Sequence, residues 1–308
     1  MRKVLLASTA LVALGSISAH AADISISGAY ATGVRTDGDN TTDESSMFSE
    51  ADVNIRFSNT TDSGITSTLN YGFDESGNTP AEDLSATLSG DFGSFNFDSV
   101  GDDGALGGFD GRADKAGEGT NATRTAGTAI SASGGIMGTG NMAIGYTLPS
   151  VMDGLKIAVN GSDTTAAGEY FGYGVSYDAG MFSIGYVKEA SNTAENTYSG
   201  LSASFGDISF GYDKSDRDNG GAATGDREST TMGVSYAMGD ITLAYETGDM
   251  KDGAGNEFVT HSQIAATYAV ATGVSAVITT SEVDASTAQE ALGHSDVDQL
   301  ELQLKLSF

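Results

Sequence analysis

The chain has 308 residues and a formal net charge of −28, with 42 Asp and Glu against 14 Lys and Arg. This acidic balance argues against binding to nucleic acid or anionic phospholipid, because both need a basic protein surface. The chain contains no cysteine and three histidines, so neither a disulfide framework nor a zinc or iron site is expected.

Residues 1–21 have the pattern of a secretory signal peptide. Arg2 and Lys3 precede the apolar run VLLASTALVALGSI, and Ala19 and Ala21 are the small residues that a signal peptidase reads. The run is too short for a membrane-spanning helix. We therefore predict an exported region over residues 22–308. Without the two basic residues of the signal, 12 basic residues stand against 42 acidic ones, and the net charge becomes −30.

Five segments between residues 23 and 98 alternate apolar and polar side chains. In ADVNIRFS, residues 51–58, the odd positions are apolar and the even positions are polar. The other four segments are DISISGAYATGVR, ITSTLNYGFD, LSATLSG and FNFDS. A period of two residues predicts β-strands with one apolar face and one polar face.

Eleven further segments of this kind follow residue 140. The last is LELQLKLSF, residues 300–308, in which leucines alternate with Glu301, Gln303 and Lys305 before the terminal Phe308. Such a strand fits either a soluble sheet or a wall between lipid and a water-filled lumen. The total of sixteen predicted strands is even, as in bacterial single-chain membrane barrels.

The predicted connections alternate between short and long. Short turns include GD at 206–207 and at 239–240, whereas long acidic connections are predicted at 36–46, 213–228 and 246–258. This order is typical of an up-and-down barrel and not of a Greek-key sandwich. We predict an all-β fold, a 16-stranded antiparallel up-and-down transmembrane β-barrel, wide enough for an aqueous channel. A soluble sandwich would bury the same apolar faces, but the signal and the loop order favour the membrane barrel.

The connection at residues 100–140 breaks this pattern by its length. It contains five acidic residues, Asp102, Asp103, Asp110, Asp114 and Glu118, mixed with Arg112, Lys115 and Arg124. Loops of this length in a compact protein are usually functional. In a wide barrel such a loop, the third of the long loops, can fold inward and narrow the lumen. The alternative is a solvated surface loop.

Specific cation sites are not expected. The segment DRDNGG resembles a calcium loop, but no acidic residue occupies the twelfth position from Asp213 or Asp216. We predict no cofactor and no resident metal, only divalent cations loosely bound by the acidic rim.

An ordered set of motifs carries a resemblance to a known family. The set comprises ISISGAYATGVR, RFSNTTDSGI, LSATLSGDFGSFNFDS, the long insertion after the fifth strand and the terminal Phe308. With these motifs the chain resembles the trimeric sixteen-stranded general porins of Gram-negative outer membranes, most of all the shorter alphaproteobacterial ones. The resemblance implies a homotrimer in the outer membrane, in contact with lipid and lipopolysaccharide.

The resemblance also implies a constriction. Acidic groups of loop 100–140 would face a basic cluster on the wall, and the alternation of side chains gives four candidates that face the lumen: Arg35, Arg56, Lys156 and Lys305. Opposed charges of this kind orient dipolar solutes and set ion preference. Because the chain has few basic residues, we predict cation preference. Phe308 would be read by the insertion machinery or would anchor one rim.

We predict a porin that lets small hydrophilic solutes and ions diffuse passively, without chemistry. A substrate-selective channel is the nearest alternative, but Tyr170 and Tyr198 are too few for a row of lumen-facing aromatic side chains. An enzyme would need a placed Ser–His or Asp–His constellation, for which the lumen-facing His261 is the formal candidate. An adhesin would have large ordered loops and no open pore.

Overall fold

The computed structural model describes residues 23–39, 43–74, 83–98, 104–106, 108–109, 111–116, 143–164, 168–192, 194–220, 226–286 and 296–308. The predicted signal peptide, residues 1–21, lies outside these ranges. No helix in the described part of the chain is long and apolar enough to cross a membrane.

Sixteen strands and one short 3-10 helix make up the described structure. The strands are β1 (Asp23–Asp39), β2 (Asp43–Thr60), β3 (Thr66–Asp74), β4 (Asp83–Gly90), β5 (Gly93–Asp98), β6 (Ala143–Thr147), β7 (Leu155–Thr164), β8 (Gly168–Asp178), β9 (Phe182–Ser191), β10 (Glu195–Phe205), β11 (Ile208–Asp218), β12 (Arg227–Met238), β13 (Ile241–Asp252), β14 (Glu257–Ala271), β15 (Val274–Ala285) and β16 (Val297–Ser307). The helix, η1, spans Gly104–Leu106 and lies between β5 and β6 in the chain.

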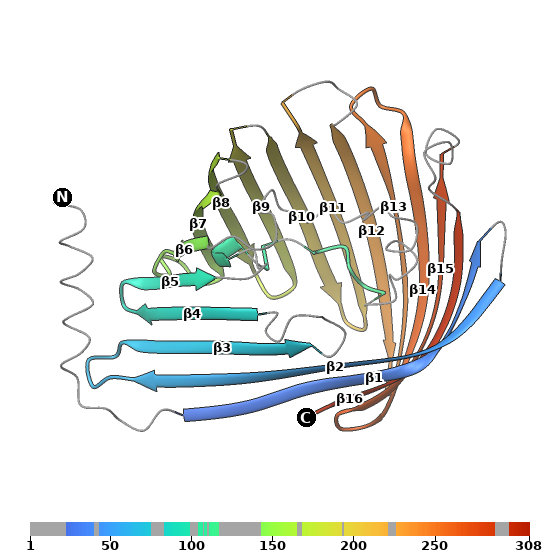
Figure 1. Ribbon diagram of the computed structural model, residues 1–308, viewed down its shortest axis with the longest axis horizontal. Coiled ribbons are helices and arrows are strands. Elements are labelled where there is room, and N and C mark those ends of the chain that lie inside the picture. Colours follow the sequence, from blue (N-terminus) through green and yellow to red (C-terminus); the bar gives the residue numbers. More distant parts are fainter. Residues whose placement is uncertain are drawn as a thin grey trace.

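The sheet is a closed antiparallel barrel. Each strand pairs with its neighbours in sequence, and β1 pairs with β16 to complete the ring (Figure 1). This topology confirms the predicted up-and-down barrel and the predicted count of strands. Closure gives every strand a hydrogen-bonded partner on both sides, which a sheet in contact with lipid requires.

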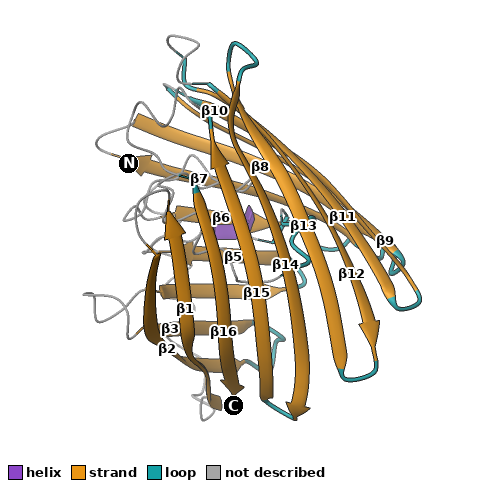
Figure 2. Cartoon of the chain, turned by 90° about the vertical axis from the view of Figure 1, so that its right-hand side faces the viewer, coloured by secondary structure: helices purple, strands orange, loops and turns teal. Residues whose placement is uncertain are grey.

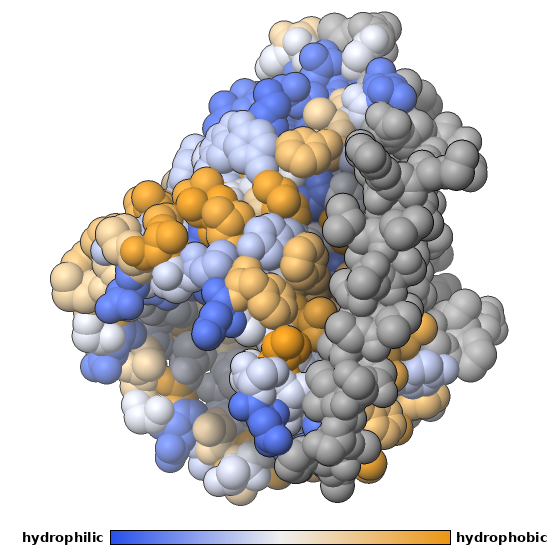
Figure 3. All heavy atoms as spheres, turned by 90° about the vertical axis from the view of Figure 1, so that its left-hand side faces the viewer, coloured by the Kyte–Doolittle hydropathy of each residue, from blue (hydrophilic) through white to orange (hydrophobic). Residues whose placement is uncertain are grey.

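The two faces of the wall differ in polarity, as the alternation predicts. In β16 the outward Leu302 and Leu304 are 52% and 41% exposed, whereas Glu301 and Gln303 between them are 3% and 6% exposed. Large apolar side chains are likewise exposed on most other strands, and hydrophobic side chains gather across the middle of the face drawn in Figure 3, with hydrophilic ones above them. The apolar residues therefore face away from the barrel, and the polar residues face its interior.

The strands extend further than predicted at the long-loop end. The segments 36–46 and 246–258, predicted as acidic loops, lie mostly in strands, and half of 213–228 does: β11 continues to Asp218, and β13 is separated from β14 by four residues. Acidic composition was the wrong guide, because opposite charges pair across these strands. Nζ of Lys214 in β11, for example, lies 3.0 Å from Oε2 of Glu228 in β12.

Candidate functional site

Part of the long insertion crosses the inner wall of the barrel. Its described residues, 104–106, 108–109 and 111–116, run across the strands from β6 to β14 and not along them (Figures 1 and 2). We call this stretch the lumen segment. Its position fits the predicted inward fold of loop 100–140.

Three backbone amides attach the lumen segment to the wall. The N–H of Ala105 donates to Oδ1 of Asn160 in β7 at 2.9 Å. Further along, the N–H of Ala113 donates to Oδ2 of Asp213 in β11 at 2.6 Å. The N–H of Lys115 donates to Oε2 of Glu246 in β13 at 3.2 Å. These acceptors are at most 8% exposed, so each bond satisfies a polar side chain that is largely removed from water.

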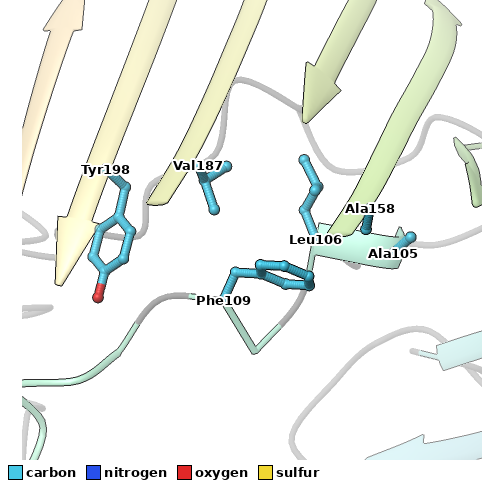
Figure 4. Packing of buried hydrophobic residues seen from close by; sticks show 6 residues of the cluster. All are labelled: Ala105, Leu106, Phe109, Ala158, Val187 and Tyr198. Carbon is cyan, nitrogen blue, oxygen red and sulfur yellow. The ribbon is translucent and has the colours of Figure 1, made fainter. Parts of the chain in front are cut away.

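Apolar contacts support the same attachment. Leu106 and Phe109 point toward the wall and pack in one buried cluster with Ala105 and with Ala158, Val187 and Tyr198 of the strands (Figure 4). At the other end of the segment, Ala116 packs against Ala244 of β13 and Ala265 of β14. The segment is thus held to the wall along its described length.

Two tyrosines on the inner face serve as hydrogen-bond donors to buried carboxylates. Tyr170 donates its hydroxyl proton to Glu189, and Tyr198 donates to Asp213. The Tyr198 hydroxyl oxygen also accepts the N–H of Arg112 at 3.4 Å. Both tyrosines, which are too few for a row of lumen-facing aromatic side chains, are at most 5% exposed and belong to the framework around the lumen segment.

The five predicted acidic residues are only partly accounted for. Asp114 lies in the lumen segment and is exposed, between Ala113 and Lys115, whose backbone amides bind the wall. Asp102, Asp103, Asp110 and Glu118 lie outside the described residues.

The predicted basic residues do not form one cluster. Nε of Arg35 lies 3.1 Å from Oε2 of the buried Glu301, and its guanidinium lies 4.7 Å from the centre of the Phe48 ring. Arg35 is opposite Ser46 of β2. Arg56 is ten residues further along β2, which corresponds to about 33 Å, so the two arginines occupy opposite ends of this strand pair.

The other basic candidates and the terminal residue lie toward the short-turn end. Lys156 is exposed near the start of β7, and Lys305 is half-buried opposite Ala31 of β1. The Phe308 side chain is 72% exposed. Its backbone exchanges two hydrogen bonds with Gly28, of 3.0 and 3.1 Å, which extends the β1–β16 pairing to the last residue.

His261 faces the lumen, as the alternation predicts, and is 6% exposed. Its Nε2 lies 3.5 Å from Oε1 of Glu246, the residue that accepts the Lys115 amide. Within the described ranges, no group of three or more His, Asp and Glu residues is arranged to hold a metal ion.

Alternation does not single out the residues that hold the lumen segment. Asp213 and Glu246 fall in the predicted acidic connections 213–228 and 246–258, and neither Asn160 nor the lumen-facing glycines stand out by residue type. One signal was present: glycine recurs at polar positions of successive strands, flanked by outward aromatic or aliphatic residues, as in FGYGVSY, SIGY and SFGY.

Comparisons with known proteins agree with the barrel. The family model described as Gram-negative porin matches residues 7–288. Two solved structures of mutant Rhodopseudomonas blastica porin have TM-scores of 0.64 and 0.63, at 16% and 17% identity. Each alignment covers 93% of this chain and 100% of the other, and at these identities the likeness concerns the fold. No curated protein matches.

Proposed function

Because the chain belongs to the Gram-negative porin family, whose members are channels of the outer membrane, we propose that small hydrophilic solutes and ions cross that membrane through its lumen by passive diffusion. The observation that carries the proposal is the lumen segment. A stretch of chain attached to the inner wall from β7 to β14 narrows the lumen, and the hydrogen-bonded ring of strands around it stays complete. Selection would then depend on the size and charge of the solute.

The charges on the inner wall favour cations. Asp213 and Glu246 are buried lumen-facing carboxylates on β11 and β13, and Asp114 adds an exposed carboxylate on the lumen segment. Arg35 and Glu301 form a pair whose charges cancel, so Arg35 adds little positive charge for solutes to meet. A lumen lined in this way raises the local concentration of cations and repels anions.

Recording single channels from the purified, folded protein in a planar bilayer tests this function. We expect stepwise ohmic currents, and a reversal potential in a KCl gradient whose sign indicates cation preference. Absence of conductance from folded protein would overturn the channel proposal, and an anion-selective reversal potential would overturn the charge mechanism. A current that saturates for one solute would instead favour the substrate-selective channel.

A homotrimer is proposed from the outward face of β5 and β6. Their outward side chains include Phe95, Phe97 and Ile144, each at least 37% exposed. Contact with neighbouring subunits, as the family resemblance implies, would cover these apolar side chains.

Contact with lipopolysaccharide is proposed for the outward face at the long-loop end. One cross-strand row there contains Lys188, Thr197, Asp216, Glu228 and Lys251. Its lysines form ion pairs, for example Lys188 with Glu195 at 2.7 Å. Ammonium groups can bind phosphates of the glycolipid, and carboxylates can bind divalent cations that bridge those phosphates.

A further inference from the structure

A row of glycines lies beneath the lumen segment. Seven lumen-facing positions on β6 and on β8 to β12 carry no side chain: Gly145, Gly172, Gly174, Gly185, Gly200, Gly211 and Gly233. Gly185 is directly opposite Gly200, and Gly211 is directly opposite Gly233. We call this row the glycine track.

The lumen segment lies so close to the glycine track that a side chain on these glycines would collide with it. A Cβ atom at Gly185 would overlap the carbonyl oxygen of Phe109, and one at Gly211 would overlap that of Arg112. At Gly233 a Cβ would overlap the carbonyl oxygen of Ala113. Backbone atoms cannot rotate away as a flexible side chain can, so any larger residue would have to move the segment itself.

The other glycines of the track make room for side chains of the segment. A Cβ at Gly174 would lie 2.9 Å from Cδ1 of Phe109, and one at Gly172 would lie 2.8 Å from Cδ1 of Leu106. A Cβ at Gly145 would overlap the Cβ of Ala105. The track therefore accommodates the segment from its first described residues to Ala113 and Lys115.

Hydrogen bonds hold the segment on the track in addition to the steric fit between segment and glycines. The acceptors Asn160, Asp213 and Glu246 bind amides spaced along the segment. Asp213 lies two residues after Gly211 on β11, so its bond forms beside this glycine. Glycine sets how closely the segment can approach the wall, whereas the three acceptors set its position along the wall.

We infer that the glycine track and these three acceptors determine the free cross-section of the lumen, because they fix how far the segment projects from the wall. The inference rests on the proposed channel function. In it, Gly211, Gly233 and Asp213 are positioning residues, which act on solutes only through the lumen segment.

Alanine substitutions on the track test the inference. We expect Gly211→Ala and Gly233→Ala to push the segment toward the lumen and to lower single-channel conductance about 1.5-fold or more, because conduction depends on the narrowest part of the pore. Gly161→Ala is the matched control, since a Cβ there meets nothing closer than 3.6 Å. Wild-type conductance in both track variants, or an equal fall in the control, would overturn the inference.

The acceptor is tested by a graded pair of substitutions. Asp213→Asn retains an oxygen that can accept the Ala113 amide, whereas Asp213→Ala removes it. We expect excess open-channel noise and easier voltage closure in Asp213→Ala, with both restored toward wild type in Asp213→Asn. Equal noise in the two variants would contradict the positioning role, since a loss of stability alone would not alter the current of folded channels.

If an alanine variant does not fold, an engineered disulfide tests whether the segment lies against the wall. The chain has no cysteine, so a bridge between Ala116→Cys and Ala244→Cys would be the only one. We expect it to form in folded protein and to leave conductance unchanged, because the segment already lies at the wall. Failure to form, or a change in conductance on oxidation, overturns the inference; absence of current from wild type would instead count against the channel function.

Discussion

The backbone N–H of Ala113 lies 2.6 Å from Oδ2 of Asp213, a residue one hundred positions later in the chain. The bond joins the lumen segment to β11, a strand of the wall that comes from the C-terminal half of the sequence. A hydrogen bond to a carboxylate contributes about 1.5–3 kcal/mol, so this contact and its two companions at Asn160 and Glu246 can hold the segment without a disulfide.

Asp114 offers a direct test of ion preference. Replacing Asp114 by Asn removes an exposed negative charge from the lumen segment and leaves the shape of the side chain. We expect the reversal potential in a KCl gradient to move toward zero with little change in conductance. Asp207→Asn, in the exposed two-residue turn between β10 and β11, is the control. The same shift in both variants would show that Asp114 has no special place in the ion path.

The Arg35–Glu301 pair should stabilise the junction between β1 and β16. In Glu301→Ala the half-buried guanidinium loses its carboxylate, and we expect about 1–3 kcal/mol less stability, seen as unfolding at a lower temperature on heat-modifiability gels. Glu282→Ala, at an exposed outward position of β15, should unfold as wild type does. Unchanged unfolding of Glu301→Ala would mean that the pair does not stabilise the junction.

Phe308 is expected to matter more for assembly than for the finished barrel. Its ring is largely exposed, whereas its backbone bonds with Gly28 do not depend on the side chain. We therefore predict that Phe308→Ala lowers the amount of barrel in the outer membrane of cells but leaves the melting temperature of refolded protein nearly unchanged. Phe205→Ala removes another exposed aromatic ring at a strand end and serves as the control. Equal membrane levels of the two variants would disprove a special role for Phe308.

The outward lysines should increase affinity for lipopolysaccharide. We expect the triple substitution Lys188→Gln, Lys214→Gln and Lys251→Gln to weaken binding of the folded protein to lipopolysaccharide in detergent, measured by co-migration on native gels. Added EDTA should weaken it further by removing bridging cations. A matched variant, Lys156→Gln, changes a lysine near the start of β7, at the short-turn end of the barrel. Unaltered binding by the triple variant would rule out this surface.

The outward aromatic side chains of β5 predict how subunits meet. Replacing Phe95 and Phe97 by Ser should reduce the trimer fraction, measured by light scattering in mild detergent, because both rings lie on the exposed apolar face. The same double change at Phe210 and Tyr236, on the outward face of β11 and β12, should leave that fraction intact. A trimer fraction lowered only by the second pair would move the interface to the other side of the barrel.

The fold could be predicted from the sequence because the alternating polarity of side chains in each strand reflects the different environments on its two faces. In residues 299–307 of β16, for example, leucines alternate with polar residues, so the segment alone shows which face is apolar, and the signal and the loop order favour lipid as its surroundings. The ends of β11 and β13 could not be read in this way, since charged residues such as Lys214 and Glu228 occur equally in loops and in paired strands. Their pairing depends on which residue lies opposite, and local composition carries no information on that.

The site was harder to predict for a related reason. The position of Asp114 in an inward loop followed from the length of the insertion, but its attachment depends on Asp213 and Glu246, which are far away in sequence. Arg35 and Arg56 were predicted on neighbouring strands, which is confirmed, yet the register separates them along the barrel. Alternation shows which face of the sheet a side chain lies on, but not its position along the barrel axis.

The glycine track also has a consequence for engineering a wider pore. Strands rich in glycine pack poorly by themselves, and here Leu106, Phe109 and the backbone of the lumen segment fill the space that side chains of β8 to β12 would otherwise occupy. Deleting the insertion would therefore expose bare backbone and remove part of the interior packing. A gain in diameter obtained by such a deletion should come with a weaker barrel, unless the glycines are filled at the same time.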